Sequence, residues 1–262
     1  MNVLLTGAAG GIGREVAIRL AEHGARLALV DRNADALNAL AADIVAAGGK
    51  AHALPADLLD ADARAALPAR AEAALGQIDV LLNLAGLLSF TPFEDEDPAR
   101  MEMLLKLNLL TPMDLTRLLL PAMKARGAGH IVNVGSTFGS IGFAYFGAYS
   151  ASKFGLRGFS EALRRELRET GIQVTYIAPR AVKTPLNTAA IYRMAQAVKM
   201  NMDTPEWVAD RIVDAVLKQA KDAYLGFPES LFVRINAILP RLVDSALRGQ
   251  NRDMEKFARE SD

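Results

Sequence analysis

Short apolar segments alternate with longer helical patterns along most of this chain of 262 residues. The apolar segments are residues 2–6, 26–30, 50–54, 78–83, 130–135, 172–177 and 223–227. The helical patterns between them cover residues 11–23, 33–47, 60–75, 98–126, 149–170 and 205–220. Strands that are apolar along their whole length suit a parallel sheet that is buried on both faces. The alternation therefore predicts an α/β fold with a doubly wound parallel sheet of about seven strands and helices on both faces.

The composition narrows the classes of function. Its 30 basic residues balance its 30 acidic residues, which argues against a nucleic-acid partner. The absence of cysteine excludes disulfides and cysteine nucleophiles, and with only three histidines we expect no metal site. No apolar run is long enough to span a membrane, and the chain begins directly with a predicted strand. We therefore expect a cytoplasmic protein.

No repeat, low-complexity segment or linker divides the chain, so we expect one domain over residues 1–262. Residues 180–204 separate the sixth strand from the next helix, and a connection of this length predicts a substrate lid. Residues 228–262 form an apolar tail with spaced arginines, which predicts an amphipathic helix that Pro240 bends or breaks. We favour docking of this tail on the same chain or on a neighbouring subunit, and contact with a membrane surface is the alternative.

The segment TGAAGGIG at residues 6–13 joins the first strand to the first helix. Its glycines, Gly7, Gly11 and Gly13, let the backbone approach a pyrophosphate, and free amides at the start of a helix attract anions. Thr6 and Ile12 belong to the same predicted nucleotide-binding loop. The alternative is a plain tight turn, but the strand–turn–helix context favours a dinucleotide site.

Two acidic residues follow neighbouring strands. Asp31 ends the second strand, where a carboxylate binds the ribose hydroxyls of NAD and repels the 2′-phosphate of NADP. Arg32 is the complication, because an arginine there either pairs with that phosphate or is a solvated loop charge. We favour NAD and keep NADP as the alternative. Asp57 follows the third strand and either binds the adenine or is an ordinary turn aspartate.

Tyr149 and Lys153 lie four residues apart at a helix start, which puts both on one face. A phenol with an ordinary pKa of about 10 is a poor acid–base group at neutral pH. A lysine cation about 4 Å away lowers that pKa toward neutrality. Ser136 ends the fifth strand, at the sheet edge where ligands bind in such folds, and can orient a substrate oxygen. Asn108 lies in an apolar helical pattern, where its amide needs a partner or is interfacial.

Together these motifs resemble the short-chain dehydrogenase/reductase family in its shorter single-domain branch. The motifs are TGAAGGIG, NLAG at residues 83–86, Asn108, Ser136 and the Tyr149/Lys153 pair. The resemblance covers roughly residues 1–185 and implies a Rossmann-like fold with hydride transfer between nicotinamide and a secondary alcohol or ketone. It implies that Ser136, Tyr149 and Lys153 form a catalytic triad. It further implies that Asn108 holds a water that links Lys153 to solvent.

The resemblance also implies a set of cofactor contacts. Lys153 binds the nicotinamide ribose beside Tyr149. The other implied contacts are Asn83, Ala85 and Gly86 on the adenosine side, and Pro179, Val182 and Thr184 after the sixth strand. Two positions depart from the family pattern, with Leu84 at a usual asparagine and Arg180 at a usual glycine. Arg180 is either a contact to an anionic substrate or cofactor phosphate, or a solvated loop charge.

These features predict an NAD(P)-dependent oxidoreductase that acts on CH–OH donors. The methionines of the lid suit an apolar substrate such as a 3-oxoacyl or steroid-like carbonyl, and simple helix core is the alternative explanation for them. The resemblance implies a homodimer or homotetramer that pairs through the helices at 98–126 and 149–170. A non-enzymatic nucleotide sensor or scaffold is the main alternative function, and a lyase or epimerase that uses nicotinamide transiently is another.

Overall fold

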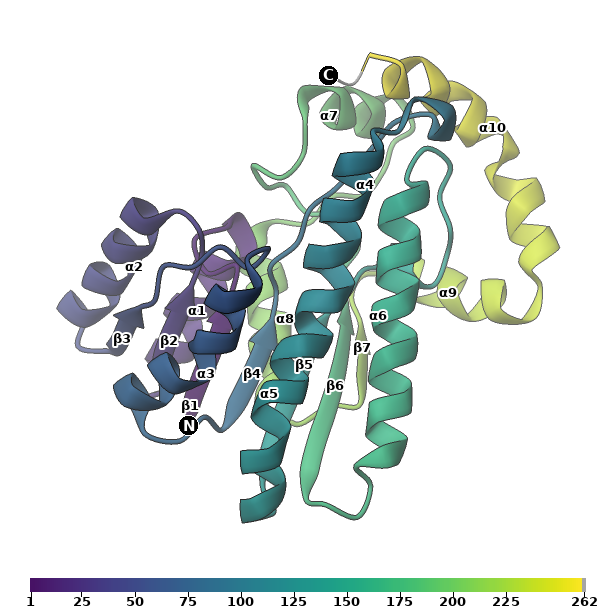
Figure 1. The fold of residues 1–262 in the computed structure, drawn as a ribbon. Helices are drawn as coiled ribbons and strands as arrows, with labels where there is room; N and C mark the ends of the chain where they lie inside the picture. The colour runs from purple at the N-terminus through teal and green to yellow at the C-terminus, as the bar shows by residue number, and fades with distance from the viewer. Residues whose placement is uncertain (261–262) are drawn as a thin grey trace.

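Seven parallel strands form one sheet in the computed structural model, which describes residues 1–260 (Figure 1). The strands are β1 (Asn2–Thr6), β2 (Arg26–Val30), β3 (Lys50–Ala53), β4 (Val80–Asn83), β5 (Gly129–Val134), β6 (Ile172–Ala178) and β7 (Asp222–Tyr224). Their spatial order is β3-β2-β1-β4-β5-β6-β7. The predicted doubly wound parallel sheet is confirmed. Its strands begin and end within about three residues of the predicted limits.

Helices cover both faces of the sheet. The helices are α1 (Gly11–Glu22), α2 (Ala34–Ala46), α3 (Ala61–Leu75), α4 (Pro98–Leu105), α5 (Thr111–Arg126), α6 (Gly147–Glu166), α7 (Ala189–Ala197), α8 (Pro205–Leu217), α9 (Glu229–Ile238) and α10 (Pro240–Ala258). Helices α1, α2 and α8 share one hydrophobic core with the sheet, whereas α3, α5 and α6 share the other. The central strands are buried by both cores, which explains their continuous apolar sequence.

The strand order reverses between β1 and β4, because β2 and β3 follow on one side of β1 and β5 to β7 follow on the other side of β4. Strands β1 and β4 are neighbours, and Thr6 lies in register with Asn83 at their carboxyl ends. The connections that leave them run to opposite sides, toward β2 from one strand and toward β5 from the other. A crevice at such a switch point is where ligands bind in open parallel sheets.

The predicted helix at 98–126 is interrupted in the structure. Helices α4 and α5 are joined by a π-helical turn, η2 (Lys106–Leu110), that contains Asn108. Such turns often occur at functional sites because the extra residue redirects a side chain. The segment 180–204 contains α7, a helix that the strand–helix pattern did not predict. Thr188 caps its first turn through a hydrogen bond from the Ile191 amide.

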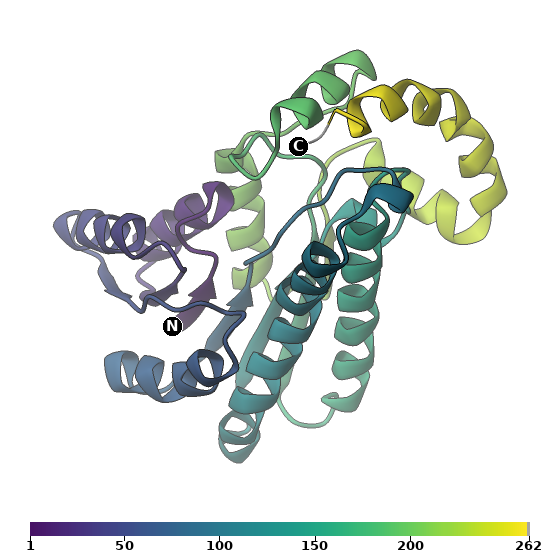
Figure 2. The same ribbon diagram turned by 45° about the horizontal axis from the view of Figure 1, so that its top comes forward.

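The tail forms two helices that meet at Pro240. Helix α9 ends at Ile238 and α10 begins at Pro240, so the predicted break is confirmed. Figure 2 shows α9 and α10 as an arch that leaves the body of the molecule and returns to it beside α7. The last two residues of the predicted tail, Ser261 and Asp262, lie outside the described residues. Among residues 1–260, no helix is both long and apolar enough to cross a membrane.

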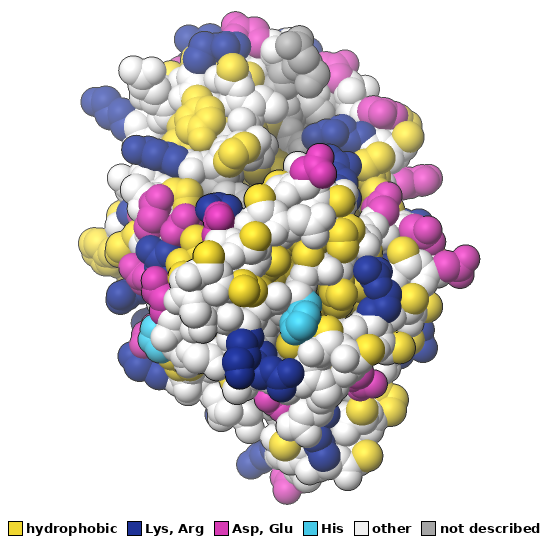
Figure 3. All heavy atoms as spheres, turned by 90° about the vertical axis from the view of Figure 1, so that its left-hand side faces the viewer, with side chains coloured by type: hydrophobic (Ala, Val, Ile, Leu, Met, Phe, Trp, Pro, Cys, Tyr) yellow, Lys and Arg dark blue, Asp and Glu magenta, His cyan; other side chains and the backbone are white. Residues whose placement is uncertain are grey.

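Side chains of both charges are interspersed on the face seen in Figure 3, which lies toward the β3 edge of the sheet. Exposed apolar side chains lie between them. This face therefore carries no patch of a single charge.

Candidate functional site

A cleft of about 560 Å³ opens at the carboxyl ends of the strands. It has the size of a small-molecule or cofactor site. Fourteen of the predicted catalytic and cofactor-binding residues line it, although they come from widely separated parts of the chain. They are Gly7, Gly11, Ile12, Asp31, Arg32, Asp57, Ala85, Gly86, Ser136, Tyr149, Lys153, Pro179, Val182 and Thr184.

The glycine-rich loop closes one end of the cleft. Gly7 has a φ of +71°, and a Cβ added there would lie 2.7 Å from the Ala85 Cα. A Cβ added at Gly13 would overlap the Gly7 carbonyl oxygen. Helix α1 begins after Gly10 with no side-chain cap, so its first amides keep their affinity for an anion. A loop this close to the backbone of neighbouring segments fits the pyrophosphate of a dinucleotide.

Asp31 and Asp57 face the cleft at the ends of β2 and β3. One Asp31 carboxylate oxygen accepts a hydrogen bond from the Ala9 amide at 3.1 Å, and the other accepts one from the Asn33 amide at 3.1 Å. The Asp57 carboxylate accepts one from the Leu59 amide at 2.9 Å. Both carboxylates therefore order their own turns as well as lining the cleft.

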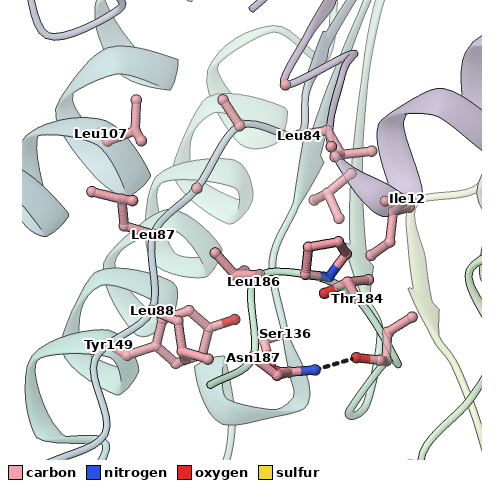
Figure 4. A pocket seen from close by; sticks show the side chains of 18 of the residues that line it. Ile12, Leu84, Leu87, Leu88, Leu107, Ser136, Tyr149, Thr184, Leu186 and Asn187 are labelled. Atoms are coloured by element: carbon pink, nitrogen blue, oxygen red, sulfur yellow. Dashed lines mark hydrogen bonds between the residues drawn. The ribbon is translucent and has the colours of Figure 1, made fainter. Parts of the chain in front are cut away.

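Helix α6 places the candidate catalytic groups together. Figure 4 shows the Tyr149 hydroxyl directed into the cleft on the side of Ser136. The Lys153 ammonium lies 5.8 Å from the centre of the Tyr149 ring and donates a hydrogen bond to the Val134 carbonyl at 3.1 Å. The Ser136 hydroxyl accepts a hydrogen bond from the Phe138 amide at 3.1 Å. Ser136, Tyr149 and Lys153 therefore lie together on one wall of the cleft.

Burial controls the acidity of these groups in the protein alone. Burial raises the pKa of Tyr149 above its usual value, and the hydrogen bond with Ser136 opposes this only partly. Burial also lowers the pKa of Lys153 to about 8, so this lysine is still largely protonated at neutral pH. Lys153 was expected to lower the pKa of Tyr149 toward neutrality, whereas burial of the phenol raises this pKa. The phenol is therefore held in its protonated, proton-donating form.

Asn108 is buried behind the cleft rather than on its wall. Its side chain accepts a hydrogen bond from the Leu87 amide at 2.7 Å and donates one to the Leu87 carbonyl at 2.9 Å. It donates another to the Ser152 hydroxyl at 3.1 Å. The amide thus has the partners that its place in an apolar helix demands. It ties the segment after β4 to α6 beside Lys153.

Three other predicted contacts also lie behind the wall. The Thr6 hydroxyl accepts a hydrogen bond from the Leu84 amide and fixes the turn after β4. Gly13 packs inside the loop against Gly7. Asn83 needs a correction, because its side chain stays within the sheet and donates a hydrogen bond to the Asn133 side chain at 2.9 Å. The Asn83 side chain therefore supports the sheet and does not itself line the cleft.

Arg180 also needs a correction. Its guanidinium binds both oxygens of the Asp203 carboxylate at 2.7 and 2.9 Å, and it binds the Glu229 carboxylate at 2.7 Å. A third acceptor is the Phe227 carbonyl at 3.1 Å. Two partly buried carboxylates thus pair with one arginine, which is neither a free anion contact nor a solvated charge. Arg180 instead joins both ends of the 180–204 segment to the start of α9.

Tyr176 is a supporting residue that the sequence analysis missed. It lies in β6, is fully buried, and its hydroxyl donates a hydrogen bond to the Ser136 carbonyl at 3.3 Å. A Cβ added at Gly135 or Gly139 would overlap its ring or hydroxyl. The two glycines therefore make room for the tyrosine beneath Ser136. Only the structure reveals this, because the contact joins residues about 40 positions apart.

We expect Tyr176→Phe to lower kcat about two- to tenfold, because it removes one hydrogen bond of about 0.5–1.5 kcal/mol that fixes the Ser136 backbone. Steady-state kinetics should show a reduced kcat with an unchanged KM for the dinucleotide. Tyr224→Phe is the matched control, since Tyr224 packs on Tyr176 but does not reach Ser136. Equal kcat values for wild type and Tyr176→Phe would contradict the positioning role.

Apolar side chains complete the cleft beyond the predicted residues. They are Leu84, Leu87, Leu88, Leu107, Phe138, Phe146, Leu186, Ile191, Met194 and Met200. Figure 4 shows the side chains of Leu186 and Asn187, in the segment after Thr184, at the cleft. The Asn187 side chain donates a hydrogen bond to the Val182 carbonyl at 2.7 Å. The 180–204 segment thus contributes one wall of the cleft.

Comparisons with known proteins agree with this geometry. Residues 1–194 match the family model described as short chain dehydrogenase. A curated relative, Ketoacyl reductase HetN from Nostoc sp., is 36% identical over 253 residues, which cover 94% of this chain and 88% of that protein.

Solved structures are similar over most of the chain. A metagenomic short-chain oxidoreductase in complex with NADP has a TM-score of 0.73 and 34% identity, with 86% of this chain and 96% of that chain covered. A short-chain dehydrogenase from Streptomyces avermitilis has a TM-score of 0.80 and 30% identity, with 96% and 98% covered.

Proposed function

The chain belongs to the short-chain dehydrogenase/reductase family, and we propose that it transfers a hydride between a nicotinamide dinucleotide and the carbon of a secondary alcohol or ketone. The observation that carries this proposal is the position of Ser136, Tyr149 and Lys153 on one wall of a cleft whose far end is the glycine-rich loop. A protein that only senses or stores the nucleotide has no chemical need for that wall.

The chain's own residues have distinct parts in the proposed reaction. Tyr149 donates a proton to the substrate oxygen in reduction and accepts it in oxidation. Ser136 holds that oxygen by a hydrogen bond, and Lys153 stabilises the phenolate after the proton has left. Asn108 fixes the backbone around Lys153 through Leu87 and Ser152, and we propose that it also holds a water for proton exchange with solvent. A bound nicotinamide supplies or receives the hydride.

The glycine-rich loop and the segments around it fit a dinucleotide. The uncapped start of α1 and the bare backbone at Gly7 suit a pyrophosphate. The remaining residues proposed to hold the cofactor lie along the cleft from its adenosine end to its nicotinamide end. They are Ile12, Asp31, Arg32, Asp57, Ala85, Gly86, Tyr149, Lys153, Pro179, Val182 and Thr184. NADP bound to the metagenomic relative adds support for a nicotinamide dinucleotide and keeps NADP open as an alternative.

We propose NAD(H) as the preferred form, because the Asp31 carboxylate is fixed at the end of β2 and would repel a 2′-phosphate. Asp31→Asn is expected to raise the ratio of kcat/KM with NADPH to kcat/KM with NADH about five- to tenfold, the effect of one charge about 4 Å away in a wet site. Asp35→Asn is the matched control, since Asp35 lies outside the cleft in the first turn of α2. An unchanged ratio for Asp31→Asn would remove this argument for NAD.

We propose that the substrate is lipophilic and that residues 180–204 act as its lid. Ile191, Met194 and Met200 bring apolar side chains from this segment to the cleft beside Tyr149. Methionines adapt to apolar ligands of different shapes. A 3-oxoacyl or steroid-like carbonyl is the class of substrate that such a wall accommodates.

We also propose a homodimer or homotetramer that pairs through α4, α5 and α6. Each of these helices, or the turn between them, leaves large apolar side chains exposed. They are Met103, Leu110, Met113 and Phe154, which are 38%, 55%, 37% and 42% exposed. Light scattering tests this assembly directly, and a monodisperse monomer at micromolar concentration would overturn it.

The test of the proposed function is a scan of NADH and NADPH oxidation with a panel of ketones and 3-oxoacyl thioesters. We expect turnover with at least one ketone and no turnover when carboxylic acids replace the ketones. Binding of either dinucleotide without turnover of any carbonyl would favour a nucleotide sensor instead.

A further inference from the structure

A second cavity, of about 400 Å³, lies beside the catalytic cleft under the arch of α9 and α10. Residues around η3 (Thr137–Gly139) line one side of it, and residues of α9 and α10 line the other. The arch is fixed at its base, where the Asn236 side chain donates a hydrogen bond to the Ser140 carbonyl at 2.9 Å. Near its other end, α10 packs on α7. The space between these anchors is therefore held open.

The walls of this second cavity are mainly apolar. The apolar lining residues are Phe138, Ile141, Phe143, Val198, Met200, Phe232, Ile235, Leu242, Val243, Ala246 and Leu247. Phe232 and Leu242 remain 46% and 59% exposed, so about half of their surface is uncovered. Apolar surface left open in this way gains stabilisation from an apolar occupant.

Arg180 and Glu229, at one end of the cavity, are paired with each other. Glu229 accepts hydrogen bonds from Arg180 at 2.7 Å and from the Asn201 side chain at 2.9 Å. Arg180 is further paired with Asp203. The group formed by Arg180, Asp203 and Glu229 carries one net negative charge, and the exposed Lys199, which also lines the cavity, carries one positive charge. The charges at this end therefore sum to zero, which favours a neutral, apolar occupant.

The second cavity adjoins the catalytic cleft and shares part of its wall. Phe138, Arg180, Ala181 and Met200 line both. The Phe138 ring packs edge-on against Tyr149, with ring centres 6.1 Å apart, and stacks on Phe143 at 4.5 Å. A row of three aromatic rings thus leads from the candidate catalytic phenol to the second cavity.

We propose that this second cavity binds the unbranched alkyl or acyl chain of the substrate, while the carbonyl of the same substrate lies at Tyr149. This inference rests on the proposed function and adds to it the place and class of the non-reacting part of the substrate. The chain passes Phe138 and Met200 and covers the exposed faces of Phe232 and Leu242. Met200 is suited to this passage because its side chain is flexible.

The test uses methyl ketones from butanone to decan-2-one with wild type, Val243→Trp and Ser245→Trp. Val243 lines the cavity from α10, whereas Ser245 lies on the exposed side of the same helix and serves as the matched control. We expect kcat/KM of wild type to rise about fourfold for each methylene that enters the cavity, the equivalent of about 0.8 kcal/mol. Val243→Trp should reduce the ratio of kcat/KM for decan-2-one to that for butanone at least tenfold, and Ser245→Trp should preserve it.

A direct binding measurement separates this inference from the proposed function. A fluorescent decyl alcohol should bind wild type and Ser245→Trp, and should bind Val243→Trp at least tenfold more weakly, whether or not any ketone is turned over. Ketone turnover with equal chain-length ratios in all three proteins would overturn the chain site alone. Loss of a dimer in Val243→Trp without a change in alkyl binding would assign the cavity to a second copy of the chain and overturn the proposal.

Discussion

Tyr149→Phe is expected to reduce ketones about 10²- to 10⁴-fold more slowly than wild type, the usual range for loss of a positioned general acid. The substitution removes only the hydroxyl that points into the cleft beside Ser136 (Figure 4). The ring, its edge contact with Phe138 and the position of Lys153 are retained. The loss should therefore appear in kcat, as measured by NADH oxidation under saturating ketone.

Tyr145→Phe is the matched control for this experiment. It also removes a single hydroxyl from a tyrosine near the start of α6, but Tyr145 does not line the cleft. Both variants should bind NADH as wild type does, which quenching of Trp207 fluorescence or equilibrium dialysis can measure. Turnover by Tyr149→Phe within about threefold of wild type would exclude the phenol as the proton donor.

The pH dependence has a definite sign. Because burial raises the pKa of Tyr149, the phenol is protonated at neutral pH and is ready to donate. Ketone reduction should therefore hold its rate through neutral pH and fall only in alkaline solution as the phenol loses its proton. Alcohol oxidation needs the phenolate and should rise over the alkaline range. Rates of ketone reduction and of alcohol oxidation, measured against pH on the same preparation, check this. A reduction rate that already declines with rising pH at values lower than pH 7.5 would contradict it.

The sequence predicted those parts of the molecule that are encoded locally. A strand buried on both faces needs a continuous apolar run, so β1 and β4 could each be predicted from their own residues. Ser136, Tyr149 and Lys153 stand at the end of a strand and the start of a helix, where the fold brings them together. Their grouping as a catalytic set came from the family resemblance, and the predicted sheet edge accounted for the place of Ser136.

The rest depends on contacts between distant segments. Nothing near Arg180 in the sequence indicates that Asp203 and Glu229 will pair with it. Likewise, Tyr176 fills the space left by Gly135 and Gly139 only after β5 and β6 have paired. Side-chain partners of this kind are set by tertiary packing, which local patterns do not record. The predicted contact at Asn83 was wrong in detail for the same reason, because Asn133 on the neighbouring strand captures its side chain.

In the tail, the break between α9 and α10 could be predicted from the local sequence, but the position of these helices could not. The effect of Pro240 on the helix followed from its chemistry, since proline cannot continue the helix before it. Whether the two helices close on the body or stand away from it depends on anchors such as Asn236 and Ser140. The second cavity therefore emerges only in three dimensions.

The other large effect is expected at the opposite end of the cleft. Gly13→Ala should weaken NADH binding on the order of 100-fold, because the added methyl group overlaps the Gly7 carbonyl and lies 2.9 Å from the Ala8 Cα. The loop must then move, and a displacement of about 1 Å from the binding geometry costs this much in positioned sites. Overpacking of the same kind should lower the free energy of unfolding by about 1–3 kcal/mol.

Isothermal titration with NADH and urea unfolding measure these two effects separately. Gly158→Ala is the matched control, because it adds the same methyl group to α6 where nothing lies within 4 Å. That control should bind NADH as wild type does and unfold at an equal or slightly higher urea concentration, since alanine favours a helix over glycine. A Gly13→Ala protein that unfolds early yet binds NADH normally would show that the close packing of this loop serves the fold alone. A protein that is stable but has lost NADH binding would show that the backbone around Gly7 is held in place for the dinucleotide.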